Sequence, residues 1–290
     1  MDSPSGAAVF AEGFGVKGPR GWAFRSVDVD AAPGSLIGVE GPSGSGRTCL
    51  LLALTGRMRP AAGRAEVGGL ALPRKMAAVR RISALAHVPG VSDLDPALTV
   101  DEHLRERALL QSRYDGSLRD LLRPRAERTG ALRQRIDAAL EAAGLDRGGL
   151  AKEGRTSVRD LERLEALRLS IALALIGRPR LLAVDDSDLK LSDADRATAW
   201  DLLRSVADAG TTVLAVCGRA QECTSVIRTD TETARDTEAA PDTDAKTAQG
   251  AEASHNAGTK TAQDAGTDGA PSAETDGEGT TDALAEAGRA

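Results

Sequence analysis

The sequence predicts an α/β fold built on parallel strands, with an inserted helical subdomain and a disordered C-terminal tail. Three observations support this prediction. A short apolar run at Ser35–Glu40 leads into a glycine-rich loop, and helical periodicity follows at Thr48–Arg57. Continuous apolar runs recur at Leu181–Val184 and Thr211–Cys217, as in central parallel strands that are covered on both faces. Between Thr99 and Leu150, by contrast, the leucines recur at helical spacing.

The remaining elements follow from local patterns. Ala7–Ala11 and Trp22–Val29 alternate in the manner of half-buried strands, and a glycine-rich turn from Gly13 to Gly21 separates them. A helix is predicted over about Leu161–Ile176, and it ends at the Gly177-Arg178-Pro179 sequence. We find no internal repeat.

The tail is distinguished by its composition. From Thr229 to Ala290 there is no aromatic residue, and Leu284 is the one large aliphatic side chain. Such a segment cannot bury enough apolar surface to offset its ordering entropy. It holds 14 of the 43 acidic residues but only 4 of the 37 basic ones, so residues 1–228 carry a net charge of +4. The acidity therefore belongs to the tail, which either solvates the protein or docks on a basic partner.

Cysteine and histidine usage argues against a zinc site. Cys49, Cys217 and Cys223 lack metal-ligand spacing, and the three histidines are scattered. No signal peptide precedes the first strand, which favours a reducing cytoplasm. No apolar run approaches the ~20 residues needed to cross a bilayer, so a membrane role would require a separate membrane partner.

The glycine-rich loop carries the chemistry. Its sequence Gly41-Pro42-Ser43-Gly44-Ser45-Gly46-Arg47-Thr48 fits the phosphate-binding pattern G-x-x-x-x-G-K-[ST] except at Arg47. In such a P-loop the backbone N–H groups surround an anionic phosphate, and the following helix adds the positive end of its dipole. We also predict that Cys49, the residue after Thr48, belongs to the nucleotide-binding site. The alternative, a turn without a ligand, is disfavoured because spacing and context both match.

Two residues are candidate magnesium ligands. Thr48 supplies a hydroxyl, and Asp185 ends an apolar strand where a P-loop protein places its second ligand. The alternative for Asp185 is a helix cap or a solvated strand end. Arg47 keeps the charge of the usual lysine but brings a larger planar fork, so we expect nucleotide binding to persist with altered affinity.

In this order, the motifs resemble those of the ATP-binding cassette (ABC) family over nearly all of residues 1–228. Gly63–Gly69 is similar to its strand after the first helix, Leu98–Leu104 to the entry into its helical subdomain, and Gly177–Leu182 to the approach to Asp185. The resemblance implies an ABC-type nucleotide-binding domain over residues 1–228, with a helical subdomain at about 94–165. Residues 229–290 form the acidic tail.

The catalytic positions depart from the family pattern. Leu161-Glu162-Arg163-Leu164-Glu165 stands at the position of the Leu-Ser-Gly-Gly-Gln signature, and Asp186 replaces the glutamate that polarises the attacking water. Asp186 is one methylene shorter, and a displacement of ~1 Å can cost about 100-fold in rate. The other departures are Gly90 for the magnesium-sensing glutamine, Gly218 for the switch histidine, and Leu191-Ser192 for Leu-Asp in the dimer-contact loop. Gly18 stands near the position of the aromatic residue that stacks on adenine. Trp22 or Phe24 would have to supply that contact, although Trp22 is better explained as a core residue.

The resemblance implies an ATP-binding subunit that uses ATP and Mg²⁺ and couples binding or slow hydrolysis to a membrane permease. Asp186 would be its catalytic residue, and the subunit would form a homo- or heterodimer at the cytoplasmic face of the membrane. The alternative is a non-hydrolytic nucleotide-binding subunit that regulates its partner. A soluble repair or chromosome-structure ATPase of the same fold is a third possibility. It is disfavoured because neither the long coiled coil nor the zinc cysteines expected of that class are present, so we expect no nucleic-acid partner. The sequence does not identify a transported substrate, because selectivity would reside in the membrane partner.

Overall fold

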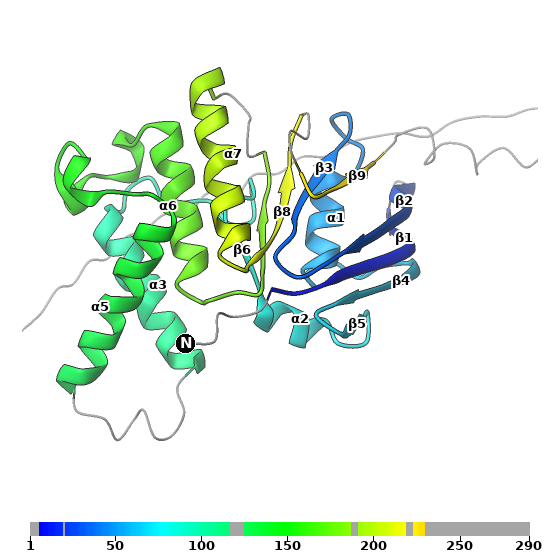
Figure 1. The fold of residues 1–290 in the computed structure, drawn as a ribbon, viewed down its shortest axis with the longest axis horizontal. Helices are drawn as coiled ribbons and strands as arrows, with labels where there is room; N and C mark the ends of the chain where they lie inside the picture. The colour runs from blue at the N-terminus through cyan, green and yellow to red at the C-terminus, as the bar shows by residue number, and fades with distance from the viewer. Residues whose placement is uncertain (1–5, 20, 116–124, 187–190, 219–222, 230–290) are drawn as a thin grey trace, which may run out of the picture. The chain divides into compact units, whose positions relative to one another are not determined.

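The computed structural model describes residues 6–19, 21–115, 125–186, 191–218 and 223–229 (Figure 1). The predictions for residues 230–290 of the tail lie outside this range. The described part contains two β-sheets, one antiparallel and one parallel, and the helices that pack on them.

The antiparallel sheet is formed mainly by the first part of the chain. Its strands, in spatial order, are β2 (Gly21–Ala31), β1 (Val9–Gly18), β4 (Ala62–Val67) and β5 (Leu70–Leu72). Both predicted strands are present, but the prediction of a glycine-rich turn at Gly13–Gly21 is wrong. β1 continues to Gly18 and pairs with β2 as far as Gly21, with register shifts that absorb the glycines. Glycines hide the alternation of a strand because they have no side chain to face either side.

The parallel sheet positions the candidate site. Its strands, in spatial order, are β6 (Ser83–Leu85), β7 (Leu181–Val184), β8 (Thr212–Val216), β3 (Leu36–Glu40) and β9 (Ser225–Arg228). The prediction of central parallel strands is confirmed, because β8 pairs in parallel with both β7 and β3 and all its residues are buried. All five strands therefore end at the same edge, where parallel sheets of this kind bind ligands.

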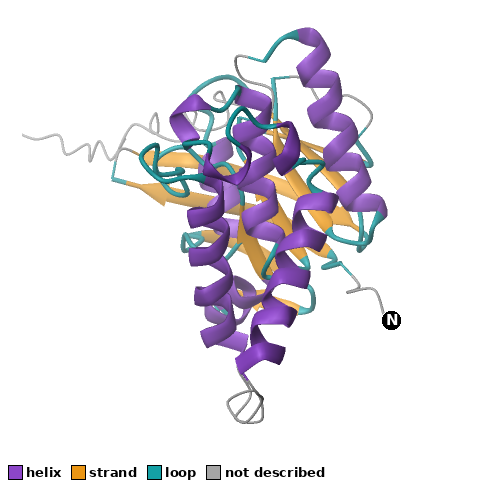
Figure 2. Cartoon of the chain, turned by 90° about the vertical axis from the view of Figure 1, so that its left-hand side faces the viewer, coloured by secondary structure: helices purple, strands orange, loops and turns teal. Residues whose placement is uncertain are grey.

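Helices cover the strands, as Figure 2 shows from the side. The described helices are α1 (Arg47–Leu54), α2 (Met76–Ile82), α3 (Val100–Asp115), α5 (Arg125–Ala142), α6 (Arg163–Leu175) and α7 (Asp193–Asp208), with short 3₁₀ turns at Arg147–Gly149, Glu153–Arg155 and Val158–Asp160. The predicted helical stretch Thr99–Leu150 therefore contains α3, α5 and the first of these turns, and the other two turns fall within the subdomain predicted at about 94–165. The helix predicted at about 161–176 is confirmed with slightly narrower bounds.

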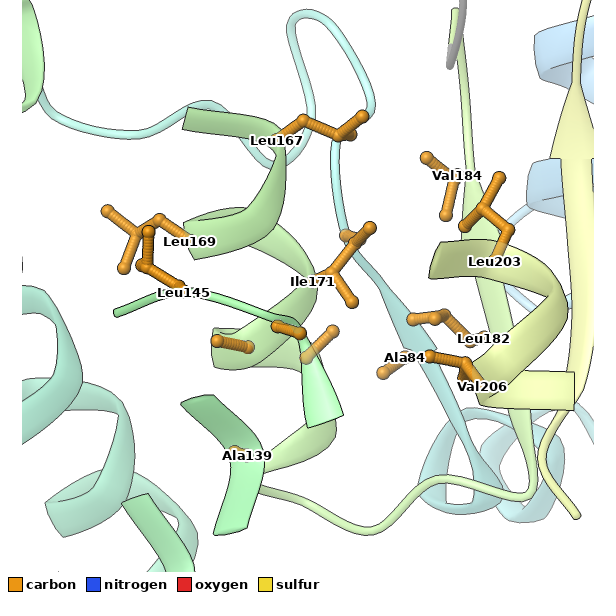
Figure 3. Close-up of a cluster of buried hydrophobic side chains, with 14 of the residues drawn as sticks. Ala84, Ala139, Leu145, Leu167, Leu169, Ile171, Leu182, Val184, Leu203 and Val206 are labelled. Carbon is orange, nitrogen blue, oxygen red and sulfur yellow. The ribbon is translucent and has the colours of Figure 1, made fainter. Parts of the chain in front are cut away.

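Alternate residues of the parallel strands enter two different cores. In β7, Leu182 and Val184 pack with α6 and α7, whereas Leu181 and Ala183 face the cluster that contains α1 and the antiparallel sheet. Figure 3 shows the first cluster, in which Leu182 and Val184 lie near Leu203 of α7. Burial on both faces explains why these strands read as continuous apolar runs.

Candidate functional site

The phosphate-binding loop joins two well-packed elements. β3 is buried between β8 and β9, and α1 begins directly after Gly46 with Leu50, Leu51 and Leu54 buried. Gly46 has φ 83°, and a Cβ there would lie 2.2 Å from the carbonyl oxygen of Ala23 in β2. The loop therefore needs glycine at this position, both for its backbone conformation and for the close approach of β2.

Thr48 and Asp185 are brought together. The Thr48 hydroxyl donates a hydrogen bond to Oδ2 of Asp185 over 2.5 Å. Asp185 is only 3% exposed, its backbone N–H donates to the carbonyl of His87 at 2.7 Å, and its Oδ1 accepts from the N–H of Asp186 at 2.9 Å. A hydroxyl and a carboxylate are oxygen ligands of the kind that Mg²⁺ prefers, with water completing the shell. The residues present therefore fit a phosphate-bound magnesium ion.

Arg47 points toward the neighbouring strand. It is the first residue of α1, and its NH1 donates to the carbonyl oxygen of Cys217 at 3.2 Å. Cys217 directly follows β8 and is 1% exposed. Arg47 and Thr48 are adjacent in sequence, and they contact the ends of β8 and β7 respectively.

Thr229 braces the loop, a role that no sequence motif indicates. Its hydroxyl lies 2.6 Å from that of Ser45, and its N–H donates to the carbonyl of Glu40 at 2.8 Å. Thr229 is 2% exposed, so the folded part includes this residue although the sequence analysis placed it in the tail. A lone threonine beside an acidic segment carries no sequence signal for such a role.

Asp186, the predicted catalytic residue, has an unusual backbone conformation. Its φ is 46°, in the left-handed region that aspartate tolerates better than most residues. The side chain is half-buried. The hydrogen bond from its N–H to Oδ1 of Asp185 places Asp186 beside the candidate magnesium ligand.

The segment at the signature position begins a helix whose N-terminus is already capped. Glu162 is the N-cap of α6, and its carboxylate accepts from the backbone N–H of Glu165. The Glu165 carboxylate in turn accepts from the N–H of Glu162 at 2.9 Å. This capping box satisfies backbone donors at the helix start and adds two negative charges there.

The other sequence departures have local structural roles. Gly90 has φ 75°, and its N–H donates to Asp93 at 2.8 Å, so it forms a tight turn where a glutamine side chain is expected. Ser192 is the N-cap of α7 and accepts from the N–H of Asp195 at 3.1 Å. Gly218 offers no side chain at the end of β8. Gly90 therefore stabilises a turn and Ser192 a helix start.

Trp22 is not a core residue, contrary to the preferred interpretation of the sequence. The indole is partly exposed and lies with the Lys17 ammonium 5.9 Å from its ring centroid. Phe24 is the buried aromatic, at 2% exposure, and its ring centroid is 5.9 Å from that of Phe14. The register of β1 and β2 pairs Phe24 with Val16 and Trp22 with Lys17, with an irregularity between the two pairs, so the two aromatic side chains lie on different faces of the sheet. A Cβ on Gly46 would lie 3.3 Å from that of Phe24.

Cys49 follows Thr48 in α1 and is half-buried. Burial, and secondarily the charge of Asp185, raises the pKa of its thiol above the ordinary value. The thiol is therefore mostly protonated near neutral pH and acts as a small packing side chain next to the candidate metal ligands. Among the described residues there is no cluster of three or more histidine, cysteine or acidic side chains suited to a transition metal.

A buried parallel strand, a glycine loop and a helix N-terminus, with Thr48 facing Asp185, define a P-loop nucleotide-binding protein. The family model described as "ABC transporter" matches residues 24–188, which is more than half of the chain. The chain belongs to the ABC transporter family, and its resemblance to the ATP-binding subunits of that family is confirmed.

Curated relatives agree with this assignment. The daunorubicin resistance ATP-binding protein DrrA3 of Streptomyces coeruleorubidus is 36% identical over 193 residues, covering 66% of this chain and 54% of the relative. The Nod factor export ATP-binding protein I of Cupriavidus metallidurans is 31% identical, covering 65% of this chain and 55% of the relative. The chain thus spans about half the length of these relatives.

Solved structures support the fold. The dimeric bacterial ABC transporter cassette MJ0796 matches with a TM-score of 0.59 and 20% identity, covering 77% of this chain and 94% of the cassette. The cbiO1 protein of Clostridium perfringens matches with a TM-score of 0.58 and 17% identity, covering 74% and 80%. The predicted fold class is confirmed. None of the described helices combines the length and the apolar character needed to cross a membrane.

Proposed function

We propose that this chain binds Mg-ATP at its P-loop and couples that binding, or slow hydrolysis, to a membrane permease. The observation that carries the proposal is the Thr48–Asp185 contact of 2.5 Å beside a glycine loop at the carboxyl edge of a parallel sheet. Residues 41–46 would surround the phosphates with backbone N–H groups, Arg47 would bind them through its guanidinium, and Cys49 would pack beside them. Thr48 and Asp185 would hold the magnesium ion, which neutralises phosphate charge when bound.

Nucleotide-induced stabilisation tests this proposal. Ligand at a hundredfold excess over its Kd stabilises the folded state by about 2.7 kcal/mol, so the Tm of the full chain should rise by about 5 °C or more with Mg-ATP. Arg47→Ala should remove most of the shift, and Asp185→Asn should remove its dependence on magnesium. Arg64→Ala is the matched control, because Arg64 pairs with Glu12 on the antiparallel sheet. An unchanged Tm at millimolar nucleotide would refute nucleotide binding.

The proposed permease would dock in a groove between α3 and α5. The groove has a volume of about 340 Å³ and is lined by the apolar residues Leu104, Leu109, Leu132 and Ile136, by the arginines Arg105, Arg133 and Arg147, and by Thr129 and Asp101. Asp101 forms an ion pair with Arg147, so the charged residues of the lining are three arginines and one carboxylate. Leu109 is 52% exposed. An apolar floor with a basic rim fits an amphipathic helix that carries acidic residues. Co-purification with a co-encoded membrane protein, lost on Leu109→Glu but retained on Arg64→Ala, is the expected result.

A homo- or heterodimer of nucleotide-binding subunits belongs to the same proposal. The relative MJ0796 is described as dimeric, and this chain would similarly face a second subunit at its P-loop. Attachment to a permease would hold the chain at the cytoplasmic face of the membrane. Sedimentation with Mg-ATP, in the presence and absence of the partner, measures both associations.

A non-hydrolytic regulatory role is the second candidate. The Glu162–Glu165 capping box brings negative charge to the segment that would approach the phosphates of a partner subunit. Steady-state phosphate release separates the two candidates. Release above background that is abolished by Asp185→Ala supports the ATPase, whereas nucleotide binding without release supports the regulatory subunit.

A further inference from the structure

Arg47 connects the phosphate-binding loop to the end of β8. Its backbone begins α1, directly after the glycine loop, and its NH1 donates to the Cys217 carbonyl at 3.2 Å. The strand order β7-β8-β3 places β8 between the strand that ends at Asp185 and the strand that leads into the loop. The guanidinium therefore lies at the middle of the edge where the loop and the magnesium candidate meet.

The chemistry of arginine suits this position in a way that lysine does not. A guanidinium is a planar fork with five N–H donors that point to different sides, whereas a lysine ammonium is a compact point charge. One edge of Arg47 already holds the Cys217 carbonyl through NH1. Its remaining donors can bind phosphate oxygens without breaking that contact, and Arg–phosphate hydrogen bonds are about twice as strong as neutral ones.

The residue after Cys217 is Gly218, which has no side chain to contact a phosphate. We propose that Arg47 performs two tasks, binding the terminal phosphate in place of the P-loop lysine and linking that phosphate to the end of β8 in place of a switch side chain. The inference rests on the proposed nucleotide binding. It makes Arg47 a specificity-determining residue for ATP over ADP, since only ATP carries the phosphate that completes the bridge.

The proposal reverses the ordinary expectation for Arg47→Lys. If Arg47 bound the phosphate in the same way as the usual P-loop lysine but less tightly, restoring lysine would raise the affinity for ATP. If Arg47 is a bridge, lysine keeps one positive charge but loses the link to β8, so the preference for ATP over ADP should fall about tenfold. Adding Gly218→His to Arg47→Lys supplies a side chain at the end of β8 and should restore most of that preference.

The test measures the Kd values of Mg-ATP and Mg-ADP by calorimetry on the full chain. Four proteins form a cycle: the unmutated chain, Arg47→Lys, Gly218→His and the double variant. Arg64→Lys is the control for an arginine-to-lysine change away from the loop, because Arg64 is exposed and pairs with Glu12. The Tm without nucleotide shows that each variant is folded. If Arg47→Lys does not fold, Arg47→Gln replaces it in the cycle, because it removes the bridging charge with a smaller polar side chain.

Support requires that the ATP-to-ADP affinity ratio falls in Arg47→Lys, stays near the original in Gly218→His and recovers in the double variant. An unchanged or higher ratio in Arg47→Lys overturns the bridge while leaving nucleotide binding intact. If the substitute Arg47→Gln is used, an unchanged ratio in it has the same meaning. If the unmutated chain binds neither nucleotide, the proposed function itself fails, and the inference fails with it.

Discussion

The hydroxyl oxygens of Ser45 and Thr229 lie 2.6 Å apart, which ties the phosphate-binding loop to the last described residue of the chain. The Thr229 hydroxyl is also 3.2 Å from the carbonyl oxygen of Glu40, to which it can donate. A Cβ on Gly41 would lie 2.3 Å from that hydroxyl, so glycine is required for the two segments to meet. The shape of the loop thus depends on a residue at the far end of the folded sequence.

Thr229→Val should therefore destabilise the protein and weaken nucleotide binding. Valine keeps the shape but leaves the buried Ser45 hydroxyl without its partner, at a cost of about 1–2 kcal/mol in the free energy of unfolding. Thr229→Ser should retain most of the stability and affinity. Thr224→Val is the control at the other end of the strand, where the hydroxyl accepts a longer bond of 3.4 Å from Leu36. Urea denaturation and Mg-ATP titration measure both effects, and equal losses in Thr224→Val and Thr229→Val would argue against a specific brace.

Removing residues 233–290 should leave the stability almost unchanged. This stretch contains Leu284 as its one large aliphatic residue and no aromatic residue, so it can bury little apolar surface. Retaining residues 230–232 keeps the C-terminal carboxylate that truncation creates away from Thr229. Thermal unfolding should show the same Tm and the same cooperativity, and amides in the removed segment should exchange without protection in the full chain. Slow exchange of a contiguous stretch would contradict the prediction of disorder.

Cys49 should react slowly with alkylating reagents, and its rate should keep rising with pH beyond the range of an ordinary thiol. Its raised pKa lowers the thiolate fraction at every pH below that value, and the thiolate is the reactive form. Asp185→Asn removes the second cause of the raised pKa of Cys49, so the rise of the alkylation rate should occur at lower pH. Mass spectrometry of iodoacetamide adducts resolves Cys49 from the other cysteines. A profile that matches free cysteine would contradict the burial of this thiol.

The parts of the fold that could be predicted are those whose signal is local. The runs at residues 35–40, 181–184 and 211–217 are apolar because both of their faces are buried, so they identify central strands on their own. The loop is recognisable because its glycine spacing follows from phosphate binding. The contact between Thr48 and Asp185, 137 residues apart in sequence, could be inferred only because the P-loop class pairs them.

Other features depend on partners that no local pattern reveals. β1 continues through Gly13 and Gly15 because β2 and β4 pair with it, although glycine itself favours no strand. Thr229 is buried through contacts with residues 184 and 189 positions earlier. Glu162 can be identified as the N-cap of α6 only when the first residue of the helix is known, and the leucine pattern located that residue only to within two positions.

Asp186→Glu alone should not restore vigorous ATP hydrolysis, although it rebuilds the residue that polarises water in the family. Asp186 has φ 46°, a conformation that glutamate adopts less readily than aspartate, so the longer side chain comes with backbone strain. Phosphoryl transfer also depends on charge stabilisation around the terminal phosphate, so a base is only one contributor. We expect a gain of severalfold at most.

Repairing the site as a unit should give a much larger gain. The Glu162–Glu165 capping box occupies the N–H of Glu165 and adds negative charge at the start of α6, and Gly218 offers no side chain. The variant that combines Asp186→Glu with the other repairs carries Glu162→Ser, Arg163→Gly, Leu164→Gly and Gly218→His. Because these groups act together, its phosphate release should exceed the product of the separate gains, on the order of 100-fold or more over the unmutated chain. Steady-state phosphate release from the single, signature-only and combined variants decides the matter, with Asp185→Ala in each background as the blank. A large rise from Asp186→Glu by itself would mean that the signature segment is dispensable in this protein.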